Sequence, residues 1–340
     1  AGKLTSRDSW WMVAGFGVAF AILLVFMFPY GAADIFDYII HARVSTEYGA
    51  NPYFTVFKNF PGDPFYTYAY WKTSPTPYGP LWEIFSALAS RLAGDGFFAN
   101  IIAFKALNGA FYLGSLALVA VILRRHAPQR ALAGTLLFAW NPMLLYETFG
   151  NGHNDILMVF FLLLAAWAIA RGWFALGVVA ITAGALSKYV PVLLLPAAGL
   201  IALRELPNWK ARLRFILVGA AGSLLLAAVS FAPYWQGMET LTVLQRSTLY
   251  TSSLPSLIYF AITGGAASPP LSAILTRIFA ILTALFALAM GWRAWKDRAW
   301  TSFAASGTLV LLFYNLVANT WSHVWYSMWS LGLAVLLPVG

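Results

Sequence analysis

Residues 10–29 read WWMVAGFGVAFAILLVFMFP, a run of twenty residues without a charged side chain. A helix of about 20 apolar residues spans the roughly 30 Å hydrocarbon layer of a bilayer. The run has no small-residue cleavage site and leads directly into Tyr30. It therefore predicts a retained membrane helix rather than a signal peptide.

Similar apolar blocks recur along the rest of the chain, at 99–123, 132–149, 155–170, 173–187, 189–203, 213–232, 271–292, 301–319 and 324–339. Of all residues, 61% are hydrophobic and 10% are charged, against about 25% charged in an average soluble domain. We therefore predict an all-α polytopic membrane protein, with one transmembrane domain over 1–340 and about ten transmembrane helices. The absence of cysteine excludes disulfides and thiolate metal sites.

Basic residues gather in the turns between alternate blocks. Thirteen of the 21 basic residues, but three of the 12 acidic ones, lie in five segments: 3–8, 124–130, 171, 204–214 and 293–298. The positive-inside rule places these segments in the cytoplasm. Because topology explains the net charge of +9, we do not expect nucleic-acid binding.

With this topology, segments 30–98 and 233–270 are extracytoplasmic loops of a multi-pass protein of the plasma (inner) membrane. The first loop is rich in tyrosine and tryptophan, which favour the headgroup level of a membrane. Within it, 80–93 is apolar but short for a crossing and contains Glu83 and Arg91, so we expect it to lie along the surface. The alternative is a tilted crossing helix, which would reverse every later loop.

Asp34 and Asp37 follow the first predicted membrane helix directly. On a helix, their i,i+3 spacing would place both carboxylates on one face. Such a pair can remove a proton from a hydroxyl or hold a metal ion. Helix capping and solvation at the interface is the alternative explanation.

Residues 150–155 read GNGHND and form a second polar group on the same predicted side. His153 can donate to phosphate oxygens, while Asn154 and Asp155 can bind hydroxyls. The alternative is that Asn154 or Asp155 simply caps the next helix.

Three cationic residues complete the set on this side: Lys188, His323 and, as a weaker candidate, Arg246. A lysine near the outer surface could neutralise a phosphate, which is the natural anionic group of a membrane-lipid substrate. The alternatives are a lysine that snorkels to the interface and, for His323, a place in the aromatic girdle.

These motifs resemble the polytopic glycosyltransferases of the C superfamily, most closely the bacterial polyprenol-phosphate-mannose-dependent mannosyltransferases. The resemblance rests on DIFDY at 34–38, NPY at 51–53, PYGPLW at 77–82, WNP at 140–142, GHND at 152–155, KYVP at 188–191 and WY at 325–326. It implies a first extracytoplasmic loop with juxtamembrane helices and a catalytic acid. One departure is size, since many relatives carry more helices after the core.

The resemblance also implies roles for single residues. Asp34 or Asp37 would be the general base that activates an acceptor hydroxyl for an inverting attack. Lys188, His153, His323 and Arg246 would bind the donor phosphate. Asn154, Asp155, Tyr78 and Tyr189 would contact sugar or acceptor. No cofactor is implied, and a divalent metal is optional because phosphate is already a good leaving group.

The expected partners are a polyprenyl-phosphate sugar, a glycan or lipid acceptor, and membrane lipids. The resemblance implies that the sugar is mannose. A transporter of lipid-linked sugar is one rival, although such folds usually show inverted repeats and midplane charges, which this sequence lacks. The other rival is a non-catalytic subunit associated with other membrane subunits.

Overall fold

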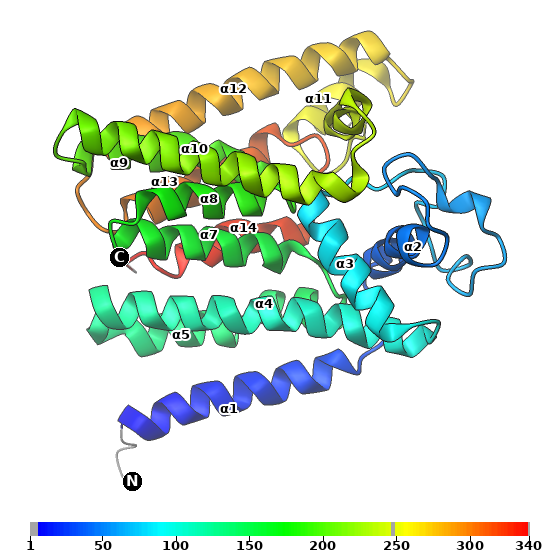
Figure 1. Ribbon diagram of the computed structural model, residues 1–340, viewed down its shortest axis with the longest axis horizontal. Coiled ribbons are helices and arrows are strands. Elements are labelled where there is room, and N and C mark those ends of the chain that lie inside the picture. Colours follow the sequence, from blue (N-terminus) through cyan, green and yellow to red (C-terminus); the bar gives the residue numbers. More distant parts are fainter. Residues whose placement is uncertain (1–5, 246–248, 339–340) are drawn as a thin grey trace.

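A computed structural model describes residues 6–245 and 249–338, and these residues form an all-helical bundle (Figure 1). Among them the only β pairing is an isolated bridge between Thr251 and Trp321. The α-helices are α1 (Ser6–Val25), α2 (Asp34–Thr46), α3 (Pro80–Ala93), α4 (Phe97–His126), α5 (Ala131–Ala139), α6 (Pro142–Leu145), α7 (Asp155–Ala170), α8 (Phe174–Ala185), α9 (Leu195–Glu205), α10 (Trp209–Phe231), α11 (Leu254–Thr263), α12 (Pro269–Lys296), α13 (Ser302–Phe313) and α14 (Ser327–Ala334).

The centre of the bundle is α7, which packs against α4, α8 and α14. Its sequence is apolar all round, and most of its side chains are buried, as expected of a helix surrounded by other helices. By contrast, α10 leaves Leu224, Leu225 and Val229 exposed. Such a surface suits contact with lipid rather than water.

A helix lies on each of the ten predicted apolar blocks. Within the described residues, four helices are both long and apolar enough to span a membrane: Arg7–Val25, Phe97–His126, Trp209–Tyr234 and Pro269–Lys296. The other bundle helices are shorter. The fold is therefore that of an all-α membrane protein, and length alone gives four spans rather than ten.

The two ends of the bundle differ in character. One end, at the left of Figure 1, carries the two termini and the basic turns. The other carries α2, α3, α11 and the segments that join them, and we call it the capped end. There α3 runs across the ends of α4 and α10 instead of beside them. Pro80 starts α3 and Gly94 ends it, in the positions that these residues favour.

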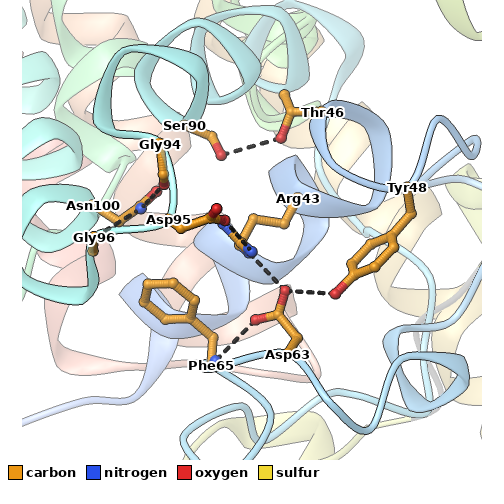
Figure 2. A network of polar contacts seen from close by, with 10 residues as sticks. All are labelled: Arg43, Thr46, Tyr48, Asp63, Phe65, Ser90, Gly94, Asp95, Gly96 and Asn100. Carbon is orange, nitrogen blue, oxygen red and sulfur yellow. Dashed lines mark hydrogen bonds and ion pairs between the residues drawn. The ribbon is translucent and has the colours of Figure 1, made fainter.

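A buried arginine fixes the position of α2 at the capped end (Figure 2). Arg43 donates from Nε to Asp63 Oδ2 at 2.7 Å and from Nη2 to Asp95 Oδ1 at 3.0 Å. Tyr48 also donates to Asp63 Oδ2, at 2.8 Å. The network ties α2 to the long first loop and to the turn between α3 and α4. It thereby holds the opposite end of α2, where Asp34 and Asp37 lie.

A buried lysine fixes the end of α1. Lys105, on α4, donates from Nζ to the backbone carbonyls of Leu24, Val25 and Met27. Leu24 and Val25 are in the last turn of α1, and Met27 follows it. The last carbonyls of a helix need donors from outside the helix and carry the negative end of its dipole. The chain therefore leaves α1 at a fixed point, nine residues before Asp34.

Candidate active site

Five of the predicted site residues come together at the capped end: Asp34, His153, Asp155, Lys188 and His323. His153 Nε2 lies 3.6 Å from Asp34 Oδ2, and Lys188 Nζ lies 2.6 Å from Asp155 Oδ1. His323 joins them through a ring stack described below. Arg246, the sixth candidate of this kind, lies outside the described residues.

Asp34 begins α2 and has the most exposed carboxylate of the group, with 28% of its side chain accessible. The cap position of α2 is Ala33, which has no side-chain cap hydrogen bond, and Asp34 is the first residue of the helix itself. Burial opposes ionisation, but contact with His153 and the charge of Lys188 outweigh it and lower the pKa of Asp34. Asp34 is therefore ionised at neutral pH.

Asp37 is one turn further along α2 and only 2% exposed. Its Oδ1 accepts from the backbone N–H groups of Tyr70, at 3.1 Å, and Trp71, at 2.8 Å. Burial raises its pKa to about 7, helped by the charge of Asp34 and opposed by the two N–H donors. Asp37 thus anchors the loop at 70–71 to α2, while the Asp34 side chain remains partly exposed.

His153 lies between two carboxylates. Its Nδ1 lies 2.9 Å from Glu147 Oε2, and its Nε2 faces Asp34. Burial lowers the pKa of an imidazole, but the two carboxylates reverse this effect and raise the pKa of His153 to about 9. His153 is therefore protonated and positively charged at neutral pH.

Glu147 was not singled out from the sequence. It lies on the π-helical turn η3 (Tyr146–Gly150), and its Oε2 also accepts from Asn151 Nδ2 at 2.8 Å. Gly152 then adopts φ +80°, which glycine tolerates best, and the chain returns His153 to Glu147. The available signal was an acid inside the apolar block 132–149, since an ionisable residue in a membrane segment indicates function.

Lys188 is held by a buried partner rather than extended towards solvent. Asp155, in the first turn of α7, is fully buried and accepts from Lys188 Nζ and from Trp329 Nε1. Lys188 Nζ also lies 4.7 Å from the ring centroid of Tyr326 and 5.4 Å from that of Trp329. With 17% of its side chain exposed, the lysine is not completely buried.

Neither Asn154 nor Asp155 serves as a plain helix cap. Asn154 occupies the cap position of α7, but its side chain makes no cap hydrogen bond. Its Oδ1 instead accepts from the Tyr38 hydroxyl, at 3.4 Å. The turn at 151–155 therefore points its polar groups into the cluster.

Tyr78 and Tyr189 meet beside Lys188 because Gly79 lets two loops approach closely. Gly79 N donates to Ser187 O at 3.1 Å, and a Cβ at position 79 would lie 2.1 Å from Leu186 O. Only glycine fits there. Tyr189 donates through its hydroxyl to Tyr78 O at 3.4 Å, and the Tyr78 ring lies 6.0 Å from Lys188 Nζ.

A stack of rings joins His153 to His323. Trp325 lies between them, with ring centroids 4.2 Å from each. The stack continues through Trp321 to Trp71, whose backbone N–H reaches Asp37. Burial lowers the pKa of His323, so this ring is neutral at neutral pH and can donate one N–H.

Several buried polar atoms of the cluster have no hydrogen-bond partner in the described structure: Asn151 Oδ1, His153 Nε2 and Asp155 Oδ2. Such atoms are uncommon in folded proteins and call for an explanation. A ligand carrying hydroxyl or phosphate groups would satisfy those that it can reach. Among the described residues no group of three or more histidine or acidic side chains is arranged to hold a metal.

Comparisons with known proteins identify the family to which the chain is similar. The family described as alpha-(1->6)-mannopyranosyltransferase, N-terminal domain, matches residues 3–204, more than half of the chain. Alpha-(1->6)-mannopyranosyltransferase A of Corynebacterium glutamicum is 25% identical over 235 residues, which are 64% of this chain and 47% of that relative. The chain thus spans about half the length of the curated relative that it matches. The matched region contains Asp34, Glu147, His153, Asp155 and Lys188, but not His323.

Proposed function

Because this chain belongs to the alpha-(1->6)-mannopyranosyltransferase family, we propose that it transfers a mannosyl residue from a polyprenyl-phosphate donor to an acceptor hydroxyl. One observation carries the proposal: an exposed, ionised Asp34 lies beside the cations His153 and Lys188 at the capped end. The acceptor is a glycan or lipid, and the bond formed is the alpha-(1->6) linkage of the family name.

The capped end faces the extracytoplasmic side of the plasma membrane, and the chain crosses the membrane about ten times. One observation supports the orientation, and another supports the number of crossings. Basic turns are concentrated at the opposite end, as the positive-inside rule requires. A helix also lies on each of the ten apolar blocks.

Asp34 acts as the general base. The acceptor hydroxyl attacks the anomeric carbon, its proton passes to Asp34, and the bond from that carbon to the phosphate oxygen breaks with inversion. Asp34 is preferred to Asp37 because a base must reach its substrate, and Asp37 is almost completely buried. Asp37 instead holds the loop at 70–71 in place.

Lys188 receives the departing phosphate. An ammonium has three N–H donors, and Asp155 and Trp329 fix the lysine while leaving part of it exposed. We assign Asp155 this holding task, since its fully buried carboxylate is unsuited to contact a sugar hydroxyl. His323 donates an N–H to the same phosphate, while Asn154, Tyr78 and Tyr189 contact sugar or acceptor.

Donor binding also prepares the base. In the free protein, His153 and Lys188 lower the pKa of Asp34. A bound phosphate would offset these positive charges and add a negative one, and both effects raise the pKa of a nearby carboxylate. Asp34 would therefore become a better base only once the donor is in place.

The direct test is transfer of radiolabelled mannose from polyprenyl-phosphate mannose to extracted glycan and lipid acceptors. We expect Asp34→Asn to reduce transfer by about 10²–10⁴-fold and Asp37→Asn to retain measurable transfer. Glu47→Gln is the matched control, because Glu47 is an exposed acid of the same loop. Full activity of Asp34→Asn in folded protein would refute the assignment of the base.

A further inference from the structure

A second pocket at the capped end is separate from the cluster around Asp34. It has a volume of about 620 Å³, and three distant segments line it: 45–51, 84–91 and 233–236. None of the cluster residues lines it. Its size falls within the range of small-molecule sites.

The walls of the pocket are tied together across the chain. Asn51 Nδ2 donates to Tyr234 O at 2.7 Å, and Asn51 Oδ1 accepts from Tyr53 N at 3.0 Å. The Tyr53 and Tyr234 rings also pack edge to face, 5.5 Å apart. The pocket is therefore a fixed feature of the fold and not a gap between loose loops.

One wall is amphipathic along the axis of α3. Ile84, Ala87, Leu88 and Arg91 all line the pocket, and their spacing puts them on one face of the helix. Leu88 is 54% exposed. An apolar stripe that ends in a guanidinium fits a ligand with an anionic head and an apolar tail.

Arg91 differs from three other cations of the capped end. Arg43 pairs with Asp63 and Asp95, Lys188 pairs with Asp155, and Lys72 donates to Tyr66 O. No hydrogen bond or ion pair reaches the Arg91 guanidinium from any residue that the structure describes, and its side chain is exposed. This cation is therefore available to an anion outside the chain.

The facing wall carries groups that suit a membrane surface. Trp235 is 47% exposed, and indoles favour the headgroup level. Gln236 beside it is exposed and can both donate and accept hydrogen bonds. Cation, indole and amide thus meet at one opening, next to the lipid-facing helix α10.

We propose that this pocket binds the phosphate head group of a membrane lipid. Arg91 contacts the phosphate, Trp235 and Gln236 contact its polar substituent, and the acyl chains run over Leu88. The site is distinct from the donor site and does not depend on the transferase proposal.

The test is hydrogen exchange of the full chain in lipid nanodiscs, followed in peptides that cover α3 and residues 233–240. We expect slower exchange with phosphatidylglycerol than with phosphatidylcholine alone. Arg91→Gln should weaken the apparent affinity about fivefold, because one basic residue near a membrane surface contributes about 1 kcal/mol. Lys58→Gln is the matched control, since Lys58 is an exposed cation of the capped end that does not line the pocket.

A second variant, Ala87→Phe, fills the pocket without changing its charge and should also remove the protection. Equal protection in wild type and Arg91→Gln would overturn the proposal, as would equal protection by the two lipids. Soluble glycerol phosphate that protects the same peptides in phosphatidylcholine nanodiscs as strongly would overturn the lipid assignment in favour of a free phosphate.

Discussion

The two ends of the bundle use their charged residues in different ways. At the basic end, Arg204 donates to the backbone carbonyls of Ala294, Trp295 and Asp297, and Arg130 donates to those of Leu336 and Leu337. These arginines complete helix ends, as cations near a helix C-terminus commonly do. At the capped end, Lys188 and His153 pair instead with buried carboxylates.

This difference distinguishes charged residues that the helix ends require from charged residues that they do not require. A helix end needs a donor whatever the protein does, so the basic end is explained by the fold alone. Buried ion pairs seldom gain stability over well-packed apolar residues, so the fold alone does not account for the pairs of Lys188 and His153. Arg43 and Lys105 do serve the fold, but we assign these two pairs to the proposed site, and the following four predictions test the contrast.

Asp155→Asn should give the largest effect on stability. The variant leaves Lys188 mostly buried without a counter-charge, and breaking such a pair costs about 3–5 kcal/mol. The measurement is the apparent free energy of unfolding of the purified protein in detergent. Adding Lys188→Met should restore most of the loss, because no charge then remains unpaired. A double variant no more stable than Asp155→Asn would contradict the pairing.

Asp37→Asn should raise stability above neutral pH. The folded protein holds the proton of Asp37 to about pH 7, against an unfolded value of 3.8. This contribution is therefore complete below pH 3.8 and is lost as the pH rises through 7. Asparagine keeps an oxygen for the two N–H donors without the charge, so the gain at pH 8 is up to about 4 kcal/mol.

Unfolding measured at pH 4.5 and pH 8 tests this prediction. Asp34, whose pKa is lowered, contributes in the opposite sense as the pH falls, in wild type and variant alike. The comparison must therefore be made between the two proteins at each pH. Equal stability of wild type and Asp37→Asn at pH 8, with Glu47→Gln as the control at an exposed acid, would contradict the buried carboxylate.

Glu147→Gln should shift the pH dependence of transfer. Glu147 helps to raise the pKa of His153 to about 9, and removal of one nearby carboxylate lowers such a pKa by about one unit or more. The alkaline limb of the kcat/KM profile should therefore move to lower pH. Glu47→Gln, which alters an exposed acid of the first loop, should leave the profile unchanged. An unchanged profile in Glu147→Gln would remove His153 from the mechanism.

Arg204→Gln should have the smallest effect. It removes hydrogen bonds to three carbonyls at the basic end, a loss of about 1–2 kcal/mol for a charged donor at a partly exposed site. Transfer at permissive temperature should equal that of wild type. A loss of transfer as large as that of Lys188→Met would mean that the two ends do not differ in the way described.

The sequence predicted the all-α membrane architecture because long uncharged apolar runs such as 10–29 indicate that lipid surrounds them. It also predicted that Asp34 and Lys188 lie on one side of the membrane, because the basic turns identify the opposite side. Glu147 was missed because its contact with His153 depends on a π-helical turn, and the spacing of apolar residues does not predict such a turn. The anchoring of Asp37 by Tyr70 and Trp71 was missed because backbone donors of an irregular loop have no sequence signature.

The contact between Lys105 and the end of α1 has a consequence for how the protein is made. Eighty residues separate Lys105 from Val25, so α1 is synthesised and inserted long before its partner on α4 exists. A lysine entering the bilayer without a partner is costly. We therefore expect α1 to stay close to the point of insertion until α4 arrives and Lys105 can bind the last carbonyls of α1.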